Sequence, residues 1–288
     1  MKKTKMLREL LNSGEAFLTA GANDALSAVI AERAGFKCVT MGGYLATAVT
    51  MARPDIGLMT LTEMSTQLRH ICDVTNIPVI ADGDNGHGNV LNVMRTVREL
   101  ENAGGAGMVL EDQVMPKRCG HMAGKKVISM EEHVAKIKAA VYAREDPDFI
   151  IIGRTDARQA HGLDDAIARG KAFAEAGADV VFVEAEENME ELERVPREIK
   201  GVPLVVNMIE GGRTPLLSLD ELAKIGYQIV FYNLGSLYTQ AKAIQDYCEY
   251  VIAHGSSIGF TGPMITFDEF NSIVGLPGLR ELEAKFQA

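Results

Sequence analysis

The sequence contains no tryptophan, few other aromatic residues and no long hydrophobic segment. No window approaches the ~20 consecutive apolar residues that a membrane-spanning helix needs. The opening stretch, MKKTKMLRELLNSGEAF, turns charged and amphipathic at once. It lacks the apolar block of about 7–15 residues that a secretory signal carries. These absences argue against an integral membrane protein, and we expect a soluble protein of the cytoplasm.

Basic residues are outnumbered by acidic ones, 29 to 39. The formal net charge is −10 and no basic block is present, which disfavours nucleic acid as a partner. The four cysteines are widely spaced, and without a CxxC pair they indicate neither a zinc site nor a redox pair. We interpret Cys38, Cys72 and Cys248 as small buried apolar residues.

Apolar segments alternate with amphipathic ones along the chain. We predict eight strands, at residues 16–23, 38–43, 78–84, 107–112, 149–156, 180–185, 203–208 and 227–233. Near-continuous apolar strands followed by helical patterns indicate a parallel sheet covered on its faces. Eight such units predict an α/β fold, the (β/α)8 TIM barrel. A doubly wound open sheet is the alternative, but it would gather polar residues at one switch point instead of after nearly every strand.

The end of the chain exceeds what eight such units need. We expect residues 1–288 to form a single barrel domain that includes a helical tail at 237–288. The tail is predicted to hold a helix near 237–253, a glycine-rich loop (GSSIGFTGP) and a final helix near 266–286. We expect this extra helix to pack elsewhere, for example on another subunit.

Polar residues follow the second and third predicted strands. The paired glycines of Met41-Gly42-Gly43-Tyr44 can bring backbone N–H groups close to an anion, although a simple tight turn is the alternative. Asp82 and Asp84 are two residues apart, so they lie on one face of an extended chain. Two carboxylates facing the same way favour a cation between them, and hard oxygen ligands favour Mg²⁺. The alternative is a helix N-cap and a turn aspartate.

The later strands end in polar residues as well. A guanidinium at a strand end, as at Arg154, is a bidentate receptor for a carboxylate, although it can equally pair with Glu111 or Asp112. Each polar residue alone can simply cap a loop, but together at one rim they predict an active site. The further members of this set are Glu184, Asn207, Glu210 and Asn233.

Cys119 lies in EDQVMPKRCGHMAGKK, the loop after the fourth strand. Lys117, Arg118 and His121 surround it in the sequence. Because cations lower the pKa of a thiol, we predict that Cys119 exchanges a proton near neutral pH. A nucleophilic role is the alternative, but the sequence offers no clear acceptor chemistry for it.

At KRCGH the sequence resembles the isocitrate lyase and phosphoenolpyruvate mutase superfamily. The resemblance covers essentially the whole chain, through GGY (42–44), PDIGLMT (54–60), ADGDNGHGN (81–89), GRTDA (153–157), FVEA (182–185) and NMIEGGRTPL (207–216). It looks like the lyase branch, since phosphonomutases lack the cysteine in this loop. The resemblance implies a (β/α)8 barrel, a homotetramer with a C-terminal helix swapped between subunits, and Mg²⁺ as the cofactor, with Mn²⁺ as a possible substitute. It also implies cleavage of the C2–C3 bond of a 2-hydroxy di- or tricarboxylate.

The resemblance assigns roles to particular residues. Asp82 and Asp84 would hold Mg²⁺ largely through water, with Asp55 and Glu111 in support. Cys119, on a mobile loop, would be the general acid, and Tyr44 is the candidate for the base that takes the hydroxyl proton. His121 and Glu184 would orient the departing acid. The substrate-binding set would be Gly42, Gly43, Tyr44, Lys117, Gly120, Arg154, Glu184, Asn207 and Asn233.

The substrate follows less directly from the sequence. This chain has NMIEGG where methylisocitrate and isocitrate lyases typically have N-x-T-E-F-G, and it has Tyr238 where an arginine is expected. These differences favour 2,3-dimethylmalate, cleaved to pyruvate and propionate. The alternatives are 2-methylisocitrate cleavage to pyruvate and succinate, then oxaloacetate hydrolysis or a phosphonomutase reaction. Asn233 matches neither the serine expected in oxaloacetate hydrolases nor the proline of several malate lyases. A catalytically silent scaffold is the alternative outside enzymes, since a fold does not by itself establish a function.

Overall fold

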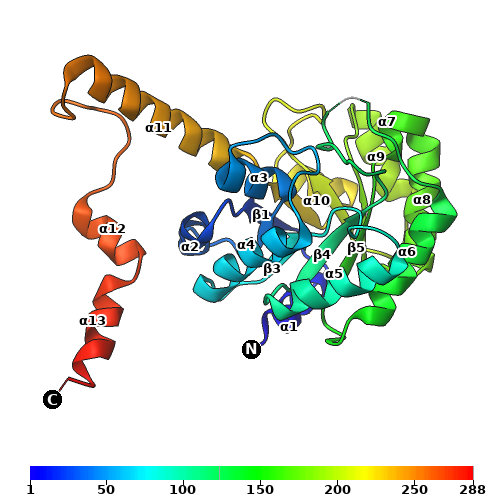
Figure 1. The fold of residues 1–288 in the computed structure, drawn as a ribbon. Coiled ribbons are helices and arrows are strands. Elements are labelled where there is room, and N and C mark those ends of the chain that lie inside the picture. Colours follow the sequence, from blue (N-terminus) through cyan, green and yellow to red (C-terminus); the bar gives the residue numbers. More distant parts are fainter. Residues whose placement is uncertain (123, 288) are drawn as a thin grey trace. The chain divides into compact units, whose positions relative to one another are not determined.

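The computed structural model describes residues 1–122 and 124–287 (Figure 1). The chain divides into two compact units, the first spanning Met1–Leu234 and the second beginning at Gly235. No described helix is long and apolar enough to cross a membrane.

The first unit is a closed barrel of eight parallel strands in sequence order. Strand β1 pairs with β2 on one side and with β8 on the other, where Phe17 aligns with Ile229, so the sheet has no free edge. The strands are β1 (Phe17–Gly21), β2 (Val39–Met41), β3 (Val79–Asp82), β4 (Gly107–Glu111), β5 (Ile150–Thr155), β6 (Val180–Val183), β7 (Leu204–Asn207) and β8 (Ile229–Tyr232). The closure confirms the predicted TIM barrel and excludes the open sheet.

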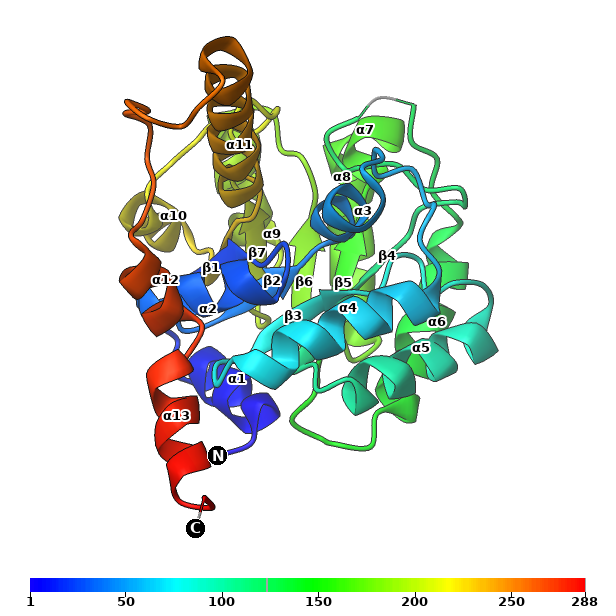
Figure 2. The same cartoon turned by 60° about the vertical axis from the view of Figure 1, so that its left-hand side comes forward.

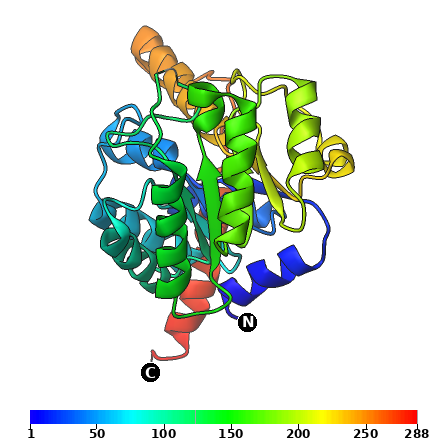
Figure 3. The same cartoon turned by 90° about the vertical axis from the view of Figure 1, so that its right-hand side faces the viewer.

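Helices surround the strands, as the views from two further sides show (Figure 2, Figure 3). They are α1 (Lys3–Asn12), α2 (Ala25–Arg33), α3 (Gly43–Met51), α4 (Leu61–Val74), α5 (Val90–Asn102), α6 (Met130–Ala143), α7 (Ala157–His161), α8 (Leu163–Glu175), α9 (Met189–Glu198) and α10 (Leu219–Ile225). Several begin at a side chain that accepts a backbone N–H of the first turn, such as Asp24, Thr60 and Ser218. Such caps satisfy donors that the helix itself leaves unpaired.

Alternate residues of each strand enter two different apolar clusters. On β5, Ile150 and Ile152 belong to a cluster inside the barrel, whereas Ile151 belongs to the larger cluster between strands and helices. This alternation is what a pleated strand buried on both faces requires. Leu7 and Leu11 of α1 join the interior cluster, so this helix packs against the barrel interior.

The second unit contains α11 (Gly235–His254), α12 (Phe267–Ile273) and α13 (Leu276–Ala284). The single helix expected near 266–286 is wrong: Gly275 adopts φ +79° and Pro277 follows at the start of the next helix, so the segment forms two helices. None of the residues described in these three helices is buried. The interpretation of Cys38 and Cys72 as buried is confirmed, but that of Cys248 is wrong, because its side chain is exposed on α11.

Candidate active site

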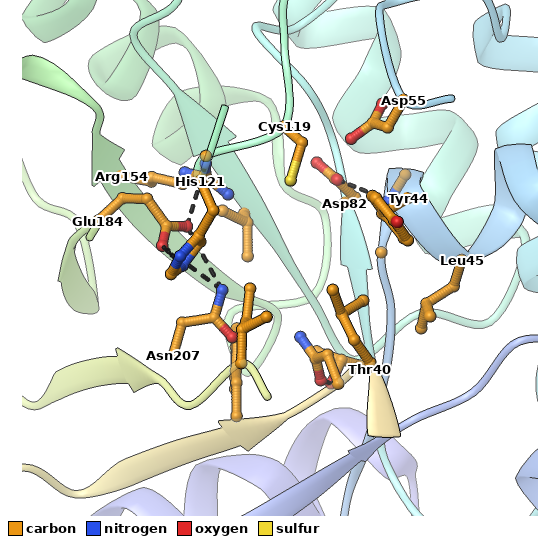
Figure 4. Close-up of a pocket in the computed structure, with 18 of the residues that line it drawn as sticks. Thr40, Tyr44, Leu45, Asp55, Asp82, Cys119, His121, Arg154, Glu184 and Asn207 are labelled. Carbon is orange, nitrogen blue, oxygen red and sulfur yellow. Dashed lines mark hydrogen bonds and ion pairs between the residues drawn. The ribbon is translucent and has the colours of Figure 1, made fainter. Parts of the chain in front are cut away.

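A cavity opens where the carboxyl ends of the barrel strands meet (Figure 4). It is lined by residues 40–45, Asp55, Ala81, Asp82, Val109, residues 117–121, Arg154, Phe182, Glu184, Asn207, Ile209, Phe231, Asn233 and Leu234. Nearly all of the predicted site residues are in this set. Asp84 and Glu111 are not in the lining; they are buried and contact residues that are. Glu210 is exposed and is not among the lining residues.

The glycine pair after β2 starts a helix. Gly42 is the N-cap of α3, and the N–H of Gly43 donates to Asp82 Oδ2 at 2.8 Å. A Cβ atom on Gly43 would lie 2.9 Å from Lys117 Nζ and 3.0 Å from Asp82 Oδ2, so only glycine fits without a shift. The predicted anion-binding N–H is therefore present, and in this structure it binds a carboxylate of the protein itself.

Three aspartates converge on the buried ammonium of Lys117. Its Nζ lies 2.7 Å from Asp84 Oδ1, 3.0 Å from Asp55 Oδ2 and 3.8 Å from Asp82 Oδ2. Burial alone would lower the pKa of Lys117, but the surrounding carboxylates outweigh it and raise that pKa well above its usual value. Burial is the larger effect at Asp55, whose pKa is raised. Three carboxylates around one ammonium leave a net charge of about −2, which suits a divalent cation.

The reason given for pairing Asp82 with Asp84 is wrong. The strand ends at Asp82, and Asp84 adopts a left-handed backbone with φ +45°, so the two residues do not share a face of an extended chain. Instead the N–H of Asp84 donates to Asp82 Oδ1 at 2.9 Å, which closes a tight turn. The turn still directs both carboxylates at Lys117.

The donor set fits a hydrated magnesium ion. Carboxylate oxygens are the ligands that Mg²⁺ takes, and it usually retains several waters. Oε1 of Glu111 is a buried acceptor without a hydrogen-bond partner among the described residues, and a metal-bound water would satisfy it. In the part of the chain that the structure describes, no three His, Cys, Asp or Glu side chains are placed to hold a metal directly. The residues therefore fit a metal held partly through water.

Arg154 at the end of β5 pairs with three buried carboxylates. It binds Asp156 through Nε and Nη2 at 2.9 and 3.0 Å, Glu184 at 3.1 Å and Glu111 at 3.5 Å. No ion pair joins it to Asp112, which instead binds Thr155 and Arg169. Burial raises the pKa of Glu111 well above its usual value, although Arg154 opposes the shift. The pKa of Glu184 is lowered, because Arg154 and His121 outweigh its burial.

Cys119 faces the cavity as a protonated thiol. Burial raises its pKa to about 11, although a hydrogen bond from the His121 backbone acts in the opposite direction. The prediction that neighbouring cations bring this pKa near neutrality is wrong, because Lys117 is engaged by the aspartates and Arg118 is exposed. A thiol that keeps its proton at neutral pH suits a proton donor better than a nucleophile.

His121 is held from both sides. Its Nε2 lies 3.1 Å from Glu184 Oε1, and its Nδ1 accepts the backbone N–H of Arg213 at 3.0 Å. Since Nδ1 is an acceptor, the ring proton lies on Nε2 and donates to Glu184. Across the cavity, Asn233 Oδ1 accepts the hydroxyl of Thr40 at 2.6 Å.

The apolar lining of the cavity was not predicted from the sequence, and neither were four polar residues in or beside it: Thr40, Lys125, Asp156 and Arg213. Lys125 is buried, and its ammonium donates to the carbonyl of Gly120 and to Asp156 Oδ1, the latter at 2.7 Å. It therefore ties the Cys119 loop to the carboxylate that holds Arg154. Asp156 and Arg213 lie within the motifs GRTDA and NMIEGGRTPL, which was the only signal for them. Thr40 lies inside an apolar strand and gave none.

Comparison with known proteins agrees with these features. A family model described as phosphoenolpyruvate phosphomutase matches residues 7–252, so the chain belongs to this family. It is 47% identical over 286 residues to the 2,3-dimethylmalate lyase of Eubacterium barkeri, with 99% of each chain covered. It is 46% identical over 273 residues to the chloroplastic carboxyvinyl-carboxyphosphonate phosphorylmutase of Arabidopsis thaliana, covering 93% of this chain and 80% of that one. A 2-methylisocitrate lyase of Aeropyrum pernix is 39% identical over 280 residues, covering 97% and 90%.

Solved structures share the whole fold. A crystal structure of 2,3-dimethylmalate lyase, described as a PEP mutase/isocitrate lyase superfamily member, superposes with a TM-score of 0.93 at 33% identity, covering 99% of this chain and 95% of that one. A phosphonopyruvate hydrolase complex with oxalate and Mg²⁺ superposes with a TM-score of 0.89 at 30% identity, covering 99% of both. The superfamily resemblance is thus confirmed. The protein is an enzyme, and relatives named as lyases support a carbon–carbon lyase.

Proposed function

We propose that this protein is a Mg²⁺-dependent lyase that cleaves the C2–C3 bond of a 2-hydroxydicarboxylate, with 2,3-dimethylmalate as the substrate and pyruvate and propionate as the products. One observation carries the proposal: the protonated thiol of Cys119 shares a cavity with Arg154 and with the aspartate cluster. This combination provides a proton donor, a carboxylate receptor and a cation site within one small volume.

The carboxylates described above would hold the metal. Asp82, Asp84 and Asp55 would bind it largely through water, with Glu111 in support. When bound, Mg²⁺ supplies positive charge to the C1 carboxylate and the 2-hydroxyl of the substrate, which makes that hydroxyl more acidic. Mn²⁺ would be accepted in its place, because the oxygen donors suit both ions.

The remaining steps belong to the chain. Arg154 binds a substrate carboxylate, and Tyr44 takes the proton of the 2-hydroxyl. The C2–O bond becomes a carbonyl, the C2–C3 bond breaks, and its electron pair stays on C3 as the enediolate of propionate. The Cys119 thiol then donates its proton to C3. One proton leaves the hydroxyl and one reaches C3, so pyruvate and propionate account for every atom of the substrate. The proton taken by Tyr44 then returns to the Cys119 thiolate, which restores the enzyme for the next turnover.

His121 and Glu184 support the departing acid. The Nε2–H of His121 and the Glu184 carboxylate form one hydrogen-bonded pair beside Cys119, and Asn207 lies 3.5 Å from both oxygens of Glu184. This pair orients the fragment that receives the proton. With the loop in place over the cavity, water has less access to the carbanion, which reduces its premature protonation by solvent.

A coupled assay tests the proposal. Pyruvate release is followed with lactate dehydrogenase for 2,3-dimethylmalate and for 2-methylisocitrate, with Mg²⁺ and with a chelator. Oxaloacetate hydrolysis is followed separately through oxalate and acetate. We expect Mg²⁺-dependent pyruvate from dimethylmalate, and about a 10²- to 10⁴-fold loss in Cys119→Ser, the range for a general acid. Cys248→Ser is the matched control, because that thiol is exposed on α11.

The other outcomes would revise specific parts of the proposal. The similarity to the 2-methylisocitrate lyase of Aeropyrum pernix makes 2-methylisocitrate the second candidate substrate. A preference for it would keep the mechanism and change the substrate. Phosphonate rearrangement without pyruvate release from either acid would move the enzyme to the mutase branch. Full activity of Cys119→Ser would remove the proton donor and overturn the mechanism. No turnover of any substrate would favour a silent scaffold.

We further propose that the active form is a cytoplasmic homotetramer in which the tail of one chain docks on another. Phe267 on α12 is 82% exposed, Leu279 on α13 is 60% exposed and Phe286, just after α13, is 82% exposed. None of the described residues of the two helices is buried. Apolar side chains exposed to this extent fit an interface. Light scattering of the full chain and of a Phe267→Glu, Leu279→Glu variant tests this: we expect a tetramer and a smaller species, respectively.

A further inference from the structure

The loop after β7 contacts the Cys119 loop at His121. Gly212 and Arg213 lie in NMIEGGRTPL, and Ile209 of the same loop lines the cavity. A Cβ atom on Gly212 would lie 2.8 Å from His121 Nδ1 and 3.0 Å from its Cε1. The imidazole therefore lies directly against the glycine backbone, so a side chain at position 212 would require the ring to shift.

Arg213 binds the same histidine through two groups, and a third group anchors its guanidinium to Glu187. Its backbone N–H donates to His121 Nδ1 at 3.0 Å, and its Nε donates to the His121 carbonyl at 3.2 Å. Its Nη1 binds Glu187 Oε1 at 2.9 Å, and that oxygen also accepts Arg158 Nη1 at 2.8 Å. The guanidinium is thus fixed by a carboxylate that the loop after β6 supplies, so Arg213 links this loop to the Cys119 loop.

The backbone N–H also determines what the histidine can do. An N–H aimed at Nδ1 requires a lone pair there, so the neutral ring keeps its proton on Nε2. That proton faces Glu184 Oε1 at 3.1 Å. If the proton moved to Nδ1, two nitrogen–hydrogen dipoles would face each other at Arg213, and Glu184 would lose the His121 donor and keep Arg154 and Asn207.

We propose that Gly212 and Arg213 form the seat of the Cys119 loop, with Arg213 as a positioning residue that acts through His121. The seat fixes the Nε2–H tautomer of His121 and the place of the Cys119 thiol two residues earlier. The consequence for catalysis rests on the lyase mechanism proposed above. The seating itself is a structural property and is measurable without substrate or metal.

Three variants separate the contributions. Gly212→Ala places a methyl group against the ring of His121 and removes the seat. Arg213→Met removes the guanidinium and keeps the backbone N–H; its side chain is 39% exposed, so we expect the fold to survive. The control is Gly211→Asn, because Gly211 has φ +73° with nothing within 4 Å of a Cβ, and asparagine tolerates this conformation.

The first measurement is alkylation of Cys119 by iodoacetamide, followed by peptide mass spectrometry in the presence of a chelator. The half-buried thiol of Cys119 should react slowly in the wild type and in Gly211→Asn. In Gly212→Ala and Arg213→Met we expect a rate about tenfold higher, as when one or two hydrogen bonds that hold a loop are lost. Trypsin cleavage after Arg118 and Lys126 should accelerate in parallel. Unchanged labelling and cleavage in both variants would overturn the proposal.

The second measurement concerns the tautomer and the rate. With ¹⁵N-labelled histidine, the His121 signal, assigned by its loss in His121→Gln, should show a protonated Nε2 in wild type and in Arg213→Met. It should lose that signature in Gly212→Ala. In the pyruvate assay kcat should fall about 10²-fold in Gly212→Ala with KM nearly constant, the cost of a misplaced catalytic group. If Cys119→Ser stays active, the lyase mechanism fails while the labelling result still decides the seat. If only Cys119→Ser loses activity, Arg213 and Gly212 do not position His121 and Cys119 for the reaction, and that part of the proposal is overturned.

Discussion

The amino-terminal and carboxyl-terminal halves of the same eight strands differ in what they bury. At the amino-terminal half, Ile150 of β5 packs with Leu7 and Leu11 of α1 in an apolar cluster inside the barrel. At the carboxyl-terminal end of the same strand, Arg154 is buried among carboxylates and Lys117 among three aspartates. Both ends bury their side chains, yet one is filled by apolar groups and the other by paired charges around a cavity.

The difference separates stability from chemistry within one fold. Burial of apolar surface stabilises the folded state in proportion to the area removed from water. Burial of a charge costs free energy unless partners compensate for it, and it shifts pKa values. Glu111, Glu186 and Cys119 all have raised pKa values caused mainly by burial. The apolar half thus holds the barrel together, and the charged end pairs its groups at some cost to stability.

Truncation of the apolar cluster should give the largest change in stability. Ile150→Ala removes a fully buried side chain inside the barrel, and we expect the free energy of unfolding to fall by about 2–5 kcal/mol. Urea denaturation measures it, with Leu91→Ala, at a 67% exposed position on α5, as the control. The kcat of the folded enzyme should stay unchanged. A large loss of kcat under conditions where the variant is fully folded would mean that the apolar half also contributes to catalysis.

Removal of a carboxylate at the carboxyl-terminal end of the barrel should weaken Mg²⁺ binding and leave stability nearly unchanged. Asp82→Asn keeps the shape of the side chain and removes a charge from the proposed metal site. We expect the Mg²⁺ concentration for half-maximal activity to rise about 10- to 100-fold, the usual effect of altering an outer-sphere metal partner. Isothermal titration with Mg²⁺ gives the same quantity without turnover. If unfolding becomes easier to the extent seen for Ile150→Ala while Mg²⁺ affinity stays constant, Asp82 is structural.

A buried carboxyl at this end makes stability depend on pH. Burial raises the pKa of Glu186 to about 8, although a hydrogen bond from Tyr227 opposes the shift. The folded state then holds a proton that the unfolded state releases above its ordinary pKa, so stability falls as pH rises towards 8. Between pH 6 and 8 the wild type should lose about 2 kcal/mol relative to Glu186→Gln. Urea midpoints at both pH values test this, and Glu190→Gln, an exposed position, should follow the wild type.

Loss of a neutral hydrogen bond at the carboxyl-terminal end should have the smallest effect on stability and activity. The Thr40 hydroxyl bonds Asn233 Oδ1 at 2.6 Å and lies 3.0 Å from the hydroxyl of Thr19. Thr40→Val keeps the shape and removes these bonds, so we expect a loss of about 1 kcal/mol in stability. We also expect KM to rise about fivefold, the factor that corresponds to 1 kcal/mol. Thr66→Val, on the exposed face of α4, is the control. An unchanged KM would show that the orientation of Asn233 does not matter to the substrate.

The sequence predicted the barrel well because its signals are local. Each strand is a short apolar run, each helix has its own period, and caps such as Asp24 lie beside the helices they begin. The final helices were predicted less well: Gly275 and Pro277 divide the expected single helix, and this local signal was overlooked. The burial of Cys248 was wrong because a cysteine in a helix carries no information about which face is covered.

The sequence predicted which residues belong to the candidate site, but it did not predict which of them contact one another. Polar residues after successive strands gave Asp82, Glu111, Arg154 and Glu184, since parallel strands bring their carboxyl ends together. The partners of these residues could not be predicted, because they are far apart in the sequence. Lys117 meets Asp55 across 62 positions, and Arg213 meets His121 across 92.

By itself, the sequence determined the eight-stranded barrel, the rim on which its polar residues gather and, through KRCGH and its companion motifs, the family. The tertiary structure alone decided which charges pair, which ring nitrogen of His121 carries the proton and that Cys119 remains a thiol. The physical reason is that periodicity and motifs are properties of neighbouring residues, whereas a pKa depends on desolvation and on charges that only the closed barrel brings within a few ångströms.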